Sequence, residues 1–144
     1  MNYARLSMAA VVAWVVSIPI GFLVNNVLFV GLIASNAAAL RPEAALMSKL
    51  PYGLVVLLAG FFAFAYIYAK GYEGRNGVAE GVRCGLALGV LVLGFGIVWQ
   101  YVIFPITWQL AAGLMVDTIV ELAIYGAIIG AIYKPAASPA AAAV

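Results

Sequence analysis

The stretch VRCGLALGVLVLGFGIVWQYVIF, residues 82–104, is an almost unbroken apolar run that ends just before Pro105. A helix needs about 20 mostly apolar residues to cross a bilayer, and this stretch is long enough to do so. Strands of a membrane barrel would instead show short segments of alternating polarity. Because only a helix satisfies its backbone hydrogen bonds within one segment in lipid, the stretch predicts a transmembrane α-helix.

Three further runs have the same character and lie at residues 6–33, 51–69 and 110–133. The first run is longer than a span needs and contains Pro19, which we expect to kink the helix. Its alternative, a cleaved signal peptide that would leave three spans, is disfavoured because the run far exceeds a typical signal core. Pro51 suits the first turn of its helix. The sequence predicts an all-α, polytopic four-transmembrane-helix bundle over residues 1–135, followed by a disordered Ala/Pro tail at 136–144.

The composition excludes several classes of function. Of the 144 residues, 67% are hydrophobic and 8% are charged, whereas a soluble domain is about half apolar and about a quarter charged. The chain has no histidine, which is the commonest zinc ligand and the commonest general base. With Cys84 as the single cysteine, we expect no disulfide, no metal site and no cofactor. A net charge of +2 without a basic cluster makes nucleic acid an unexpected partner, and the lipid bilayer the expected one.

The basic residues divide unequally between the two sides of the predicted bundle. One side carries Arg5, Lys70, Arg75, Arg83 and Lys134, and the other carries Arg41 and Lys49. Basic residues accumulate on the cytoplasmic side of membrane proteins, so both termini are expected in the cytoplasm. The connection 70–81 then forms a cytoplasmic hairpin with glycines suited to turns and with Glu80 and Arg83 spaced for an ion pair. On the outer side, residues 42–47 are candidates for a short interfacial helix before the second span.

Glycine pairs mark one face on each of the last two spans. Gly85 and Gly89 are four residues apart on the third span, and Gly126 and Gly130 are four apart on the fourth. Small residues at this spacing let two helix backbones approach closely in lipid. We expect the third and fourth spans to pack as a tight antiparallel pair at these glycines. The alternative is that the same face forms a homodimer.

Two carboxylates lie inside the fourth span. Asp117 and Glu121 are four residues apart, so they share one helical face. A charge at this depth is costly, and such residues usually face the bundle interior and find a partner. We therefore expect Glu121 to be protonated and to hydrogen-bond Asn25 or Asn26 of the first span, in a polar pocket in the outer half. These four residues are candidates for a proton, ion or ligand site, and the alternative is a purely structural interhelical contact.

Three short stretches of the chain resemble a known group of proteins. They are YIYAKGYEG at 66–74, EGVRCG at 80–85 and IYKP at 132–135. With them the chain resembles a group of small, uncharacterised bacterial four-helix integral membrane proteins. The resemblance implies the same topology and a place in the bacterial inner membrane, and it carries no activity that could be transferred.

Three functions fit these features. The first is a non-catalytic membrane protein, an accessory subunit or helper of a larger membrane complex, or a homodimer. The second is a small proton-coupled transporter or ligand-binding protein that uses Glu121 and Asp117. The third is a membrane enzyme, but the only candidate groups are Asp117, Glu121 and Cys84, and the cysteine is expected too far from the acids to cooperate. We predict no catalytic residues.

Overall fold

The computed structural model describes residues 1–135, and within this part the chain is all helical. Four helical segments are long and apolar enough to cross a membrane: Tyr3–Leu28, Glu43–Lys70, Gly77–Ile103 and Trp108–Ile132. The expected tail at 136–144 lies outside the described residues. The elements are α1 (Tyr3–Leu23), the π-helical turn η1 (Val24–Leu28), α2 (Val30–Ser35), the 3₁₀ turn η2 (Ala37–Ala39), α3 (Glu43–Lys70), α4 (Gly77–Val92), the π-helical turn η3 (Leu93–Ile97), α5 (Val98–Ile103) and α6 (Trp108–Ile132).

Polar side chains set the start of three helices. Asn2, Asn76 and Thr107 precede α1, α4 and α6, and each accepts a hydrogen bond from a backbone N–H in the first turn of its helix. Such caps satisfy donors that have no partner within the helix. The hairpin between α3 and α4 turns at Gly74, whose φ of 83° lies in the left-handed region that favours glycine.

Two predicted boundaries are wrong. The second apolar helix begins at Glu43, so residues 42–47 do not form a separate helix and Pro51 lies inside α3. The residues after Pro42 are mostly strong helix formers, and a proline removes only one backbone bond from a long helix. The first segment ends at Leu28 rather than at residue 33, and its last turn, Val24–Leu28, is π-helical, with the Phe29 N–H donating to the Val24 carbonyl oxygen five residues back.

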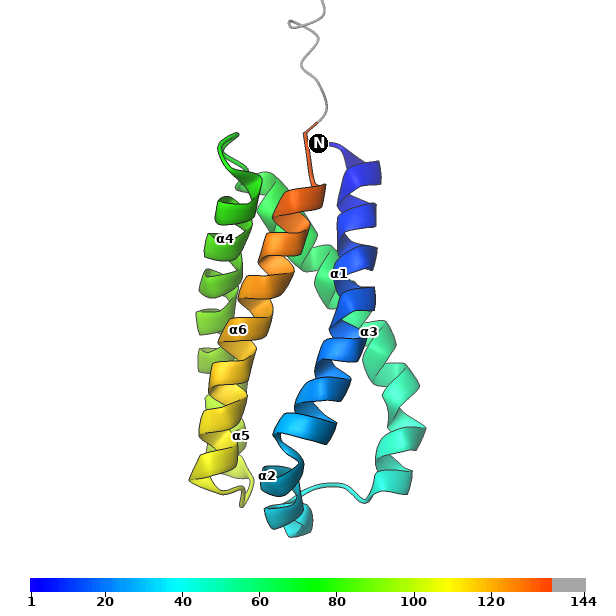
Figure 1. Ribbon diagram of the computed structural model, residues 1–144, viewed down its shortest axis with the longest axis vertical. Helices are drawn as coiled ribbons and strands as arrows, with labels where there is room; N and C mark the ends of the chain where they lie inside the picture. Colours follow the sequence, from blue (N-terminus) through cyan, green and yellow to red (C-terminus); the bar gives the residue numbers. More distant parts are fainter. Residues whose placement is uncertain (136–144) are drawn as a thin grey trace, which may run out of the picture.

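Both ends of the described chain lie at the same end of the bundle as the hairpin between α3 and α4 (Figure 1). We call this the terminal end, and we call the opposite end, with the connections 36–42 and 104–107, the far end. Arg5 Nη1 donates to the Ile132 carbonyl oxygen at 3.5 Å and joins α1 to the end of α6. The five basic residues of one predicted side therefore lie together at the terminal end.

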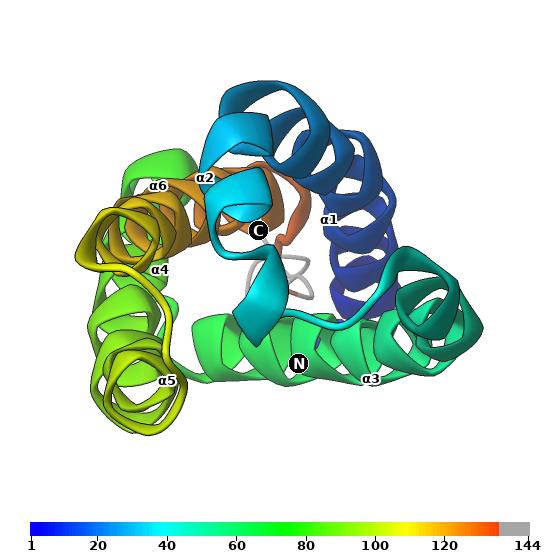
Figure 2. The ribbon, with the colours of Figure 1, turned by 90° about the horizontal axis from the view of Figure 1, so that it is seen from below.

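Helices α4 and α6 form the closest pair in the structure and run antiparallel side by side (Figures 1 and 2). A Cβ atom added at Gly81 would overlap the Gly126 carbonyl group, and one added at Gly85 would overlap the Leu122 carbonyl group. The contact continues to Gly130 at the terminal end. Only glycine allows this approach, because a larger side chain would meet backbone that cannot rotate away.

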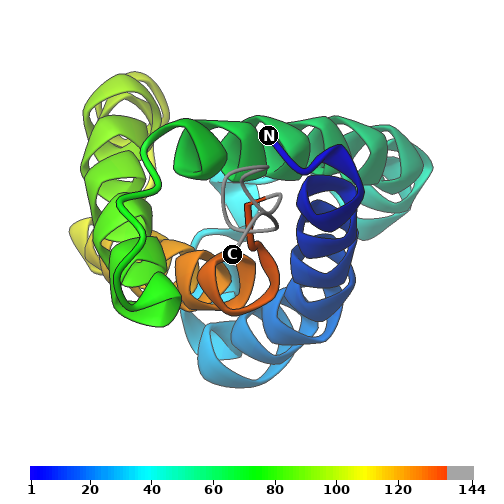
Figure 3. The same ribbon diagram turned by 90° about the horizontal axis from the view of Figure 1, so that it is seen from above.

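A smaller buried group lies at the far end, at Val24, Asn36, Leu110 and Ala111, and the main core fills the terminal half. Its buried members are Leu6, Ala9, Ala10, Ala13, Phe61, Phe64, Ala65, Tyr68, Tyr125, Ile129 and Tyr133. Along α3 no residue before Phe61 is buried, and no residue of α5 is buried. Seen from the far end, α5 and the beginning of α3 lie on opposite sides of the bundle (Figure 2), and the view from the terminal end shows α1, α3, α4 and α6 arranged in a ring (Figure 3).

Candidate functional site

Helix α6 presents one face to α4 and another to the interior. Gly126 lies on the α4 face, against Gly81. The neighbouring Tyr125 points to α3, where its ring meets the Phe61 ring edge-on with centroids 5.1 Å apart. Because residues four apart share a helical face, Glu121 lies one turn and Asp117 two turns before Tyr125. We call Asp117, Glu121 and Tyr125 the polar stripe.

The polar stripe contains unpaired polar groups. Within residues 1–135, neither Asp117 nor Glu121 forms an ion pair with a basic side chain. The Tyr125 side chain is 4% exposed, and its hydroxyl lies beside the Glu121 carboxyl without a well-aligned hydrogen bond. A buried hydroxyl without an aligned partner is uncommon and costly, so this point of the bundle favours a further hydrogen-bonding group.

The expected bond from Glu121 to Asn25 or Asn26 is absent. The Asn25 side-chain amide donates to the Gly21 carbonyl oxygen at 2.8 Å, and the Asn26 amide donates to the Phe22 carbonyl oxygen at 3.0 Å. Both side chains are exposed. The reason is local: both residues lie in η1, where the widened turn disturbs the regular backbone ladder and leaves carbonyl groups for side chains to bond.

Glu121 lies near the middle of the α4–α6 pair, because its neighbour Leu122 packs against Gly85 and Ile119 packs against Gly89. The members of the polar stripe therefore line two different spaces. Glu121 faces the interior beside Tyr125, whereas Asp117 lies in the wall of a different space.

That space is a groove between η1 and α6 of about 480 Å³. Its lining is Leu28, Phe29, Ala112, Gly113, Val116, Asp117 and Val120. Asp117 is the only charged residue in this lining. Gly113 makes room for Phe29, because a Cβ atom there would lie 3.1 Å from the Phe29 Cζ atom. The groove is wide open toward the outside of the bundle, and it combines an apolar wall with one carboxylate.

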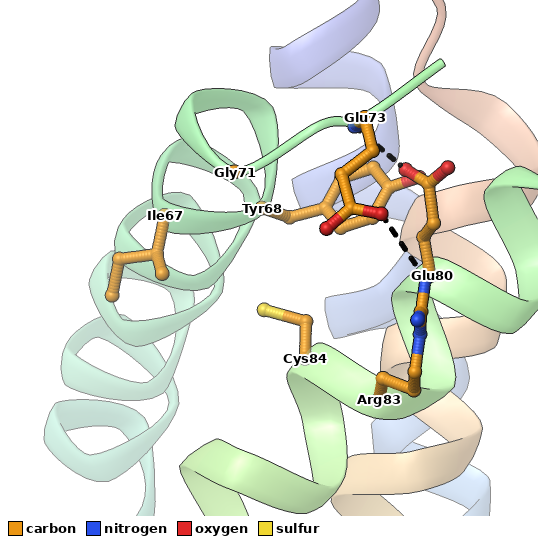
Figure 4. A pocket seen from close by; sticks show the side chains of 7 residues that line it. All are labelled: Ile67, Tyr68, Gly71, Glu73, Glu80, Arg83 and Cys84. Carbon is orange, nitrogen blue, oxygen red and sulfur yellow. Dashed lines mark hydrogen bonds and ion pairs between the residues drawn. The ribbon is translucent and has the colours of Figure 1, made fainter. Parts of the chain in front are cut away.

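A second polar arrangement organises the hairpin at the terminal end (Figure 4). Glu80 is 6% exposed and accepts the Glu73 N–H at 3.0 Å and the Arg75 N–H at 2.6 Å. The Tyr68 hydroxyl donates to the Gly77 carbonyl oxygen at 3.0 Å. We call these bonds the hairpin clamp. They hold the turn to α3 and α4.

The predicted pairing of Glu80 with Arg83 is wrong. Arg83 Nη2 lies 3.6 Å from a carboxylate oxygen of Glu73 instead, because Glu80 is turned inward to the backbone of the hairpin. Cys84 points from α4 toward α3, into a pocket of about 340 Å³ with Ile67 and Tyr68 in its lining (Figure 4). It is not in the lining of the Asp117 groove.

Sequence reasoning missed several residues that matter here. Gly77 and Gly81 were interpreted as turn residues, yet both contact α6, and their four-residue spacing with Gly85 and Gly89 is a signal that could have revealed them. Asn36 could not have been found, since its partner is distant in the chain. Its Nδ2 donates to Thr107 Oγ1 at 3.0 Å, and its Oδ1 accepts the Thr107 N–H at 2.6 Å.

Within the part of the chain that the structure describes, no group of three or more acidic or sulfur ligands could hold a metal ion. Comparison with protein-family models, with curated proteins and with solved structures finds no match to this chain. The features that bear on function are therefore the exposed first half of α3, the polar stripe and the groove.

Proposed function

We propose that the protein is a multi-pass protein of the bacterial inner membrane, with four transmembrane helices and with its terminal end in the cytoplasm. The four long apolar helices support insertion. The gathering of five basic residues at the terminal end, against Arg41 and Lys49 at the far end, supports the orientation. The inner membrane of bacteria follows from the resemblance of its hairpin and final helix to bacterial proteins.

Within that membrane we propose a non-catalytic role as an accessory subunit of a larger complex. The observation that carries this proposal is the exposed first half of α3 at the far end of the bundle. The first half of α3, residues 43–60, contributes no buried side chain, and its one polar tie to α1 is the bond from Trp14 Nε1–H to the Leu54 carbonyl oxygen at 3.0 Å. A helix of a partner protein placed between this part of α3 and α5 would complete the bundle.

The polar stripe offers the partner helix a hydrogen-bonding site at Glu121. Glu121 is half-buried and has no basic neighbour among the described residues. An acid inside a membrane bundle usually finds a donor or a cation. A partner helix with a hydrogen-bond donor at mid-depth would supply one, and it would cover apolar side chains such as Tyr52 and Val55, which are 74% and 67% exposed.

The test is site-specific photocrosslinking in the native membrane. A photoreactive residue at Val55 should capture one protein of fixed mass, and native mass spectrometry after gentle extraction should recover that protein in stoichiometric amount. The matched control is Met8 on α1, which is 46% exposed but lies in the closed terminal half. Capture of lipid alone at both positions would contradict the proposal.

A second candidate, proton-coupled transport, is favoured by the buried Tyr125 hydroxyl beside Glu121. Two groups that can exchange a proton, one of them without a fixed partner, are what a protonatable transport site requires. Glu121→Gln separates the two functions. An accessory subunit should still assemble with its partner, whereas a proton-coupled transporter should lose transport.

A further inference from the structure

The groove between η1 and α6 has an apolar lining with a single acidic side chain. Six of its lining residues are apolar or glycine, and the seventh is Asp117. The groove is open to the outside of the bundle along Val116 and Val120, which are 65% and 50% exposed. In a membrane, a molecule would reach it from the bilayer rather than from water.

Depth makes the Asp117 carboxylate unusual. Asp117 follows the start of α6 at Trp108 by nine residues, which places it about 13 Å from that end of the helix. None of the seven basic side chains lines the groove. A carboxylate in an apolar wall at this depth is stabilised by a cation that can itself leave water.

We propose that this groove binds a lipophilic organic cation, a molecule with an apolar body and one positive charge, taken up from the membrane. The volume of about 480 Å³ suits one such molecule. Asp117 supplies the charge partner, and Val116, Val120 and Leu28 contact the apolar body. Phe29 closes one side of the groove, where its ring can lie against the cation.

The size of the residue at position 113 controls how much of the groove stays empty, because Gly113 lies in its wall next to Phe29. Its lack of a side chain gives Phe29 the space to fold onto α6, since the Phe29 Cζ atom is 3.1 Å from the position of a Cβ there. A leucine at this position would push the Phe29 ring into the groove. This substitution closes the site by shape while Asp117 keeps its charge.

The probes are tetraphenylphosphonium and tetraphenylborate, which have nearly the same size and shape but opposite charges. Binding of each is measured by equilibrium dialysis with the full chain in neutral maltoside micelles. The wild-type protein should bind one phosphonium per chain saturably and should not bind the borate in this way. Equal binding of the two ions, or no saturable binding of the phosphonium, would overturn the proposal, since the occupant would then be selected by apolarity alone.

Variants locate the site. Asp117→Asn, which keeps the side-chain shape, should weaken phosphonium binding by about tenfold or more, and Gly113→Leu should weaken it as well. Glu43→Gln removes one negative charge from an exposed position at the start of α3 and should leave affinity unchanged. Unchanged affinity in Asp117→Asn, or a loss confined to Glu121→Gln, would overturn the assignment. Each variant is first checked for native helix content and a monodisperse elution profile.

Discussion

Substitution of Gly81 by alanine tests the contact between α4 and α6. A Cβ atom at this position would lie 2.7 Å from the Gly126 carbonyl carbon and 3.2 Å from the Gly130 Cα atom. The Gly126 carbonyl oxygen lies nearer still, so the two backbones would have to separate by more than the 0.7 Å that brings its carbonyl carbon to ordinary contact at 3.4 Å. The atoms met are backbone atoms, which cannot rotate away as a side chain can.

The expected cost follows from that separation. A gap of about 0.5–1 Å forfeits roughly a quarter to a half of the dispersion energy of each contact along the pair. Overpacking of this kind typically costs about 1–3 kcal/mol. We therefore expect Gly81→Ala to lower the free energy of unfolding by about 2 kcal/mol, measured by titration with a denaturing detergent in mixed micelles and followed by circular dichroism.

Two matched alanine variants make the result specific. Gly53 on α3 has no atom within 4 Å of an added Cβ, so Gly53→Ala should range from no change to a gain of about 1 kcal/mol from helix propensity. Gly89→Ala meets the end of the Ile119 side chain, which can rotate, and should cost less than Gly81→Ala. If Gly81→Ala is as stable as Gly53→Ala, the reasoning about backbone contact is refuted.

Three further substitutions test the other polar contacts. Glu80→Gln keeps an acceptor for one backbone N–H and places an NH2 donor against the other, and should cost about 1.5–3 kcal/mol and speed tryptic cleavage of the hairpin. Asn36→Ala leaves the Thr107 N–H without its partner, and should cost about 1–3 kcal/mol and speed amide exchange at the start of α6. Trp14→Phe removes the bond to the Leu54 carbonyl, and should cost about 1 kcal/mol by detergent titration.

Each of these variants has a control in the same chain. Glu43→Gln also removes a carboxylate, but at an exposed position. Asn25→Ala removes an amide that bonds only within its own helical segment. Trp99→Phe changes a tryptophan that is 55% exposed. A variant that cannot be distinguished from its control in stability would show that the hydrogen bond in question contributes nothing measurable.

The helices could be predicted from the sequence because long apolar runs leave few other structures possible in lipid. The close approach of α4 and α6 could be anticipated in part, since Gly85, Gly89, Gly126 and Gly130 carry the spacing and all lie at that contact. Gly96, seven residues after Gly89, has open space around it, and it lies within η3, where the π-helical turn changes the phase of the helix.

The polar contacts were harder to predict, because they depend on which way a side chain turns. Glu80 has both Arg83 and the hairpin backbone within reach, and only the fold shows that it bonds the backbone. The Asn25 and Asn26 side chains hydrogen-bond carbonyl groups of their own helical segment at η1, and their spacing does not predict a π-helical turn. The division of Asp117 from Glu121 depends on where Phe29 packs, which is a tertiary feature.

Labelling of single cysteines from one side of the membrane tests the central claim of four spans with a cytoplasmic terminal end. In a Cys84→Ser background, Ala38→Cys lies at the far end and Asn76→Cys lies in the hairpin, with only α3 between them as a span. In intact cells, a membrane-impermeant maleimide should label Ala38→Cys, and should label Asn76→Cys only after the membrane is opened. Labelling of both positions from the same side would contradict α3 as a span, and the reverse pattern would contradict the orientation.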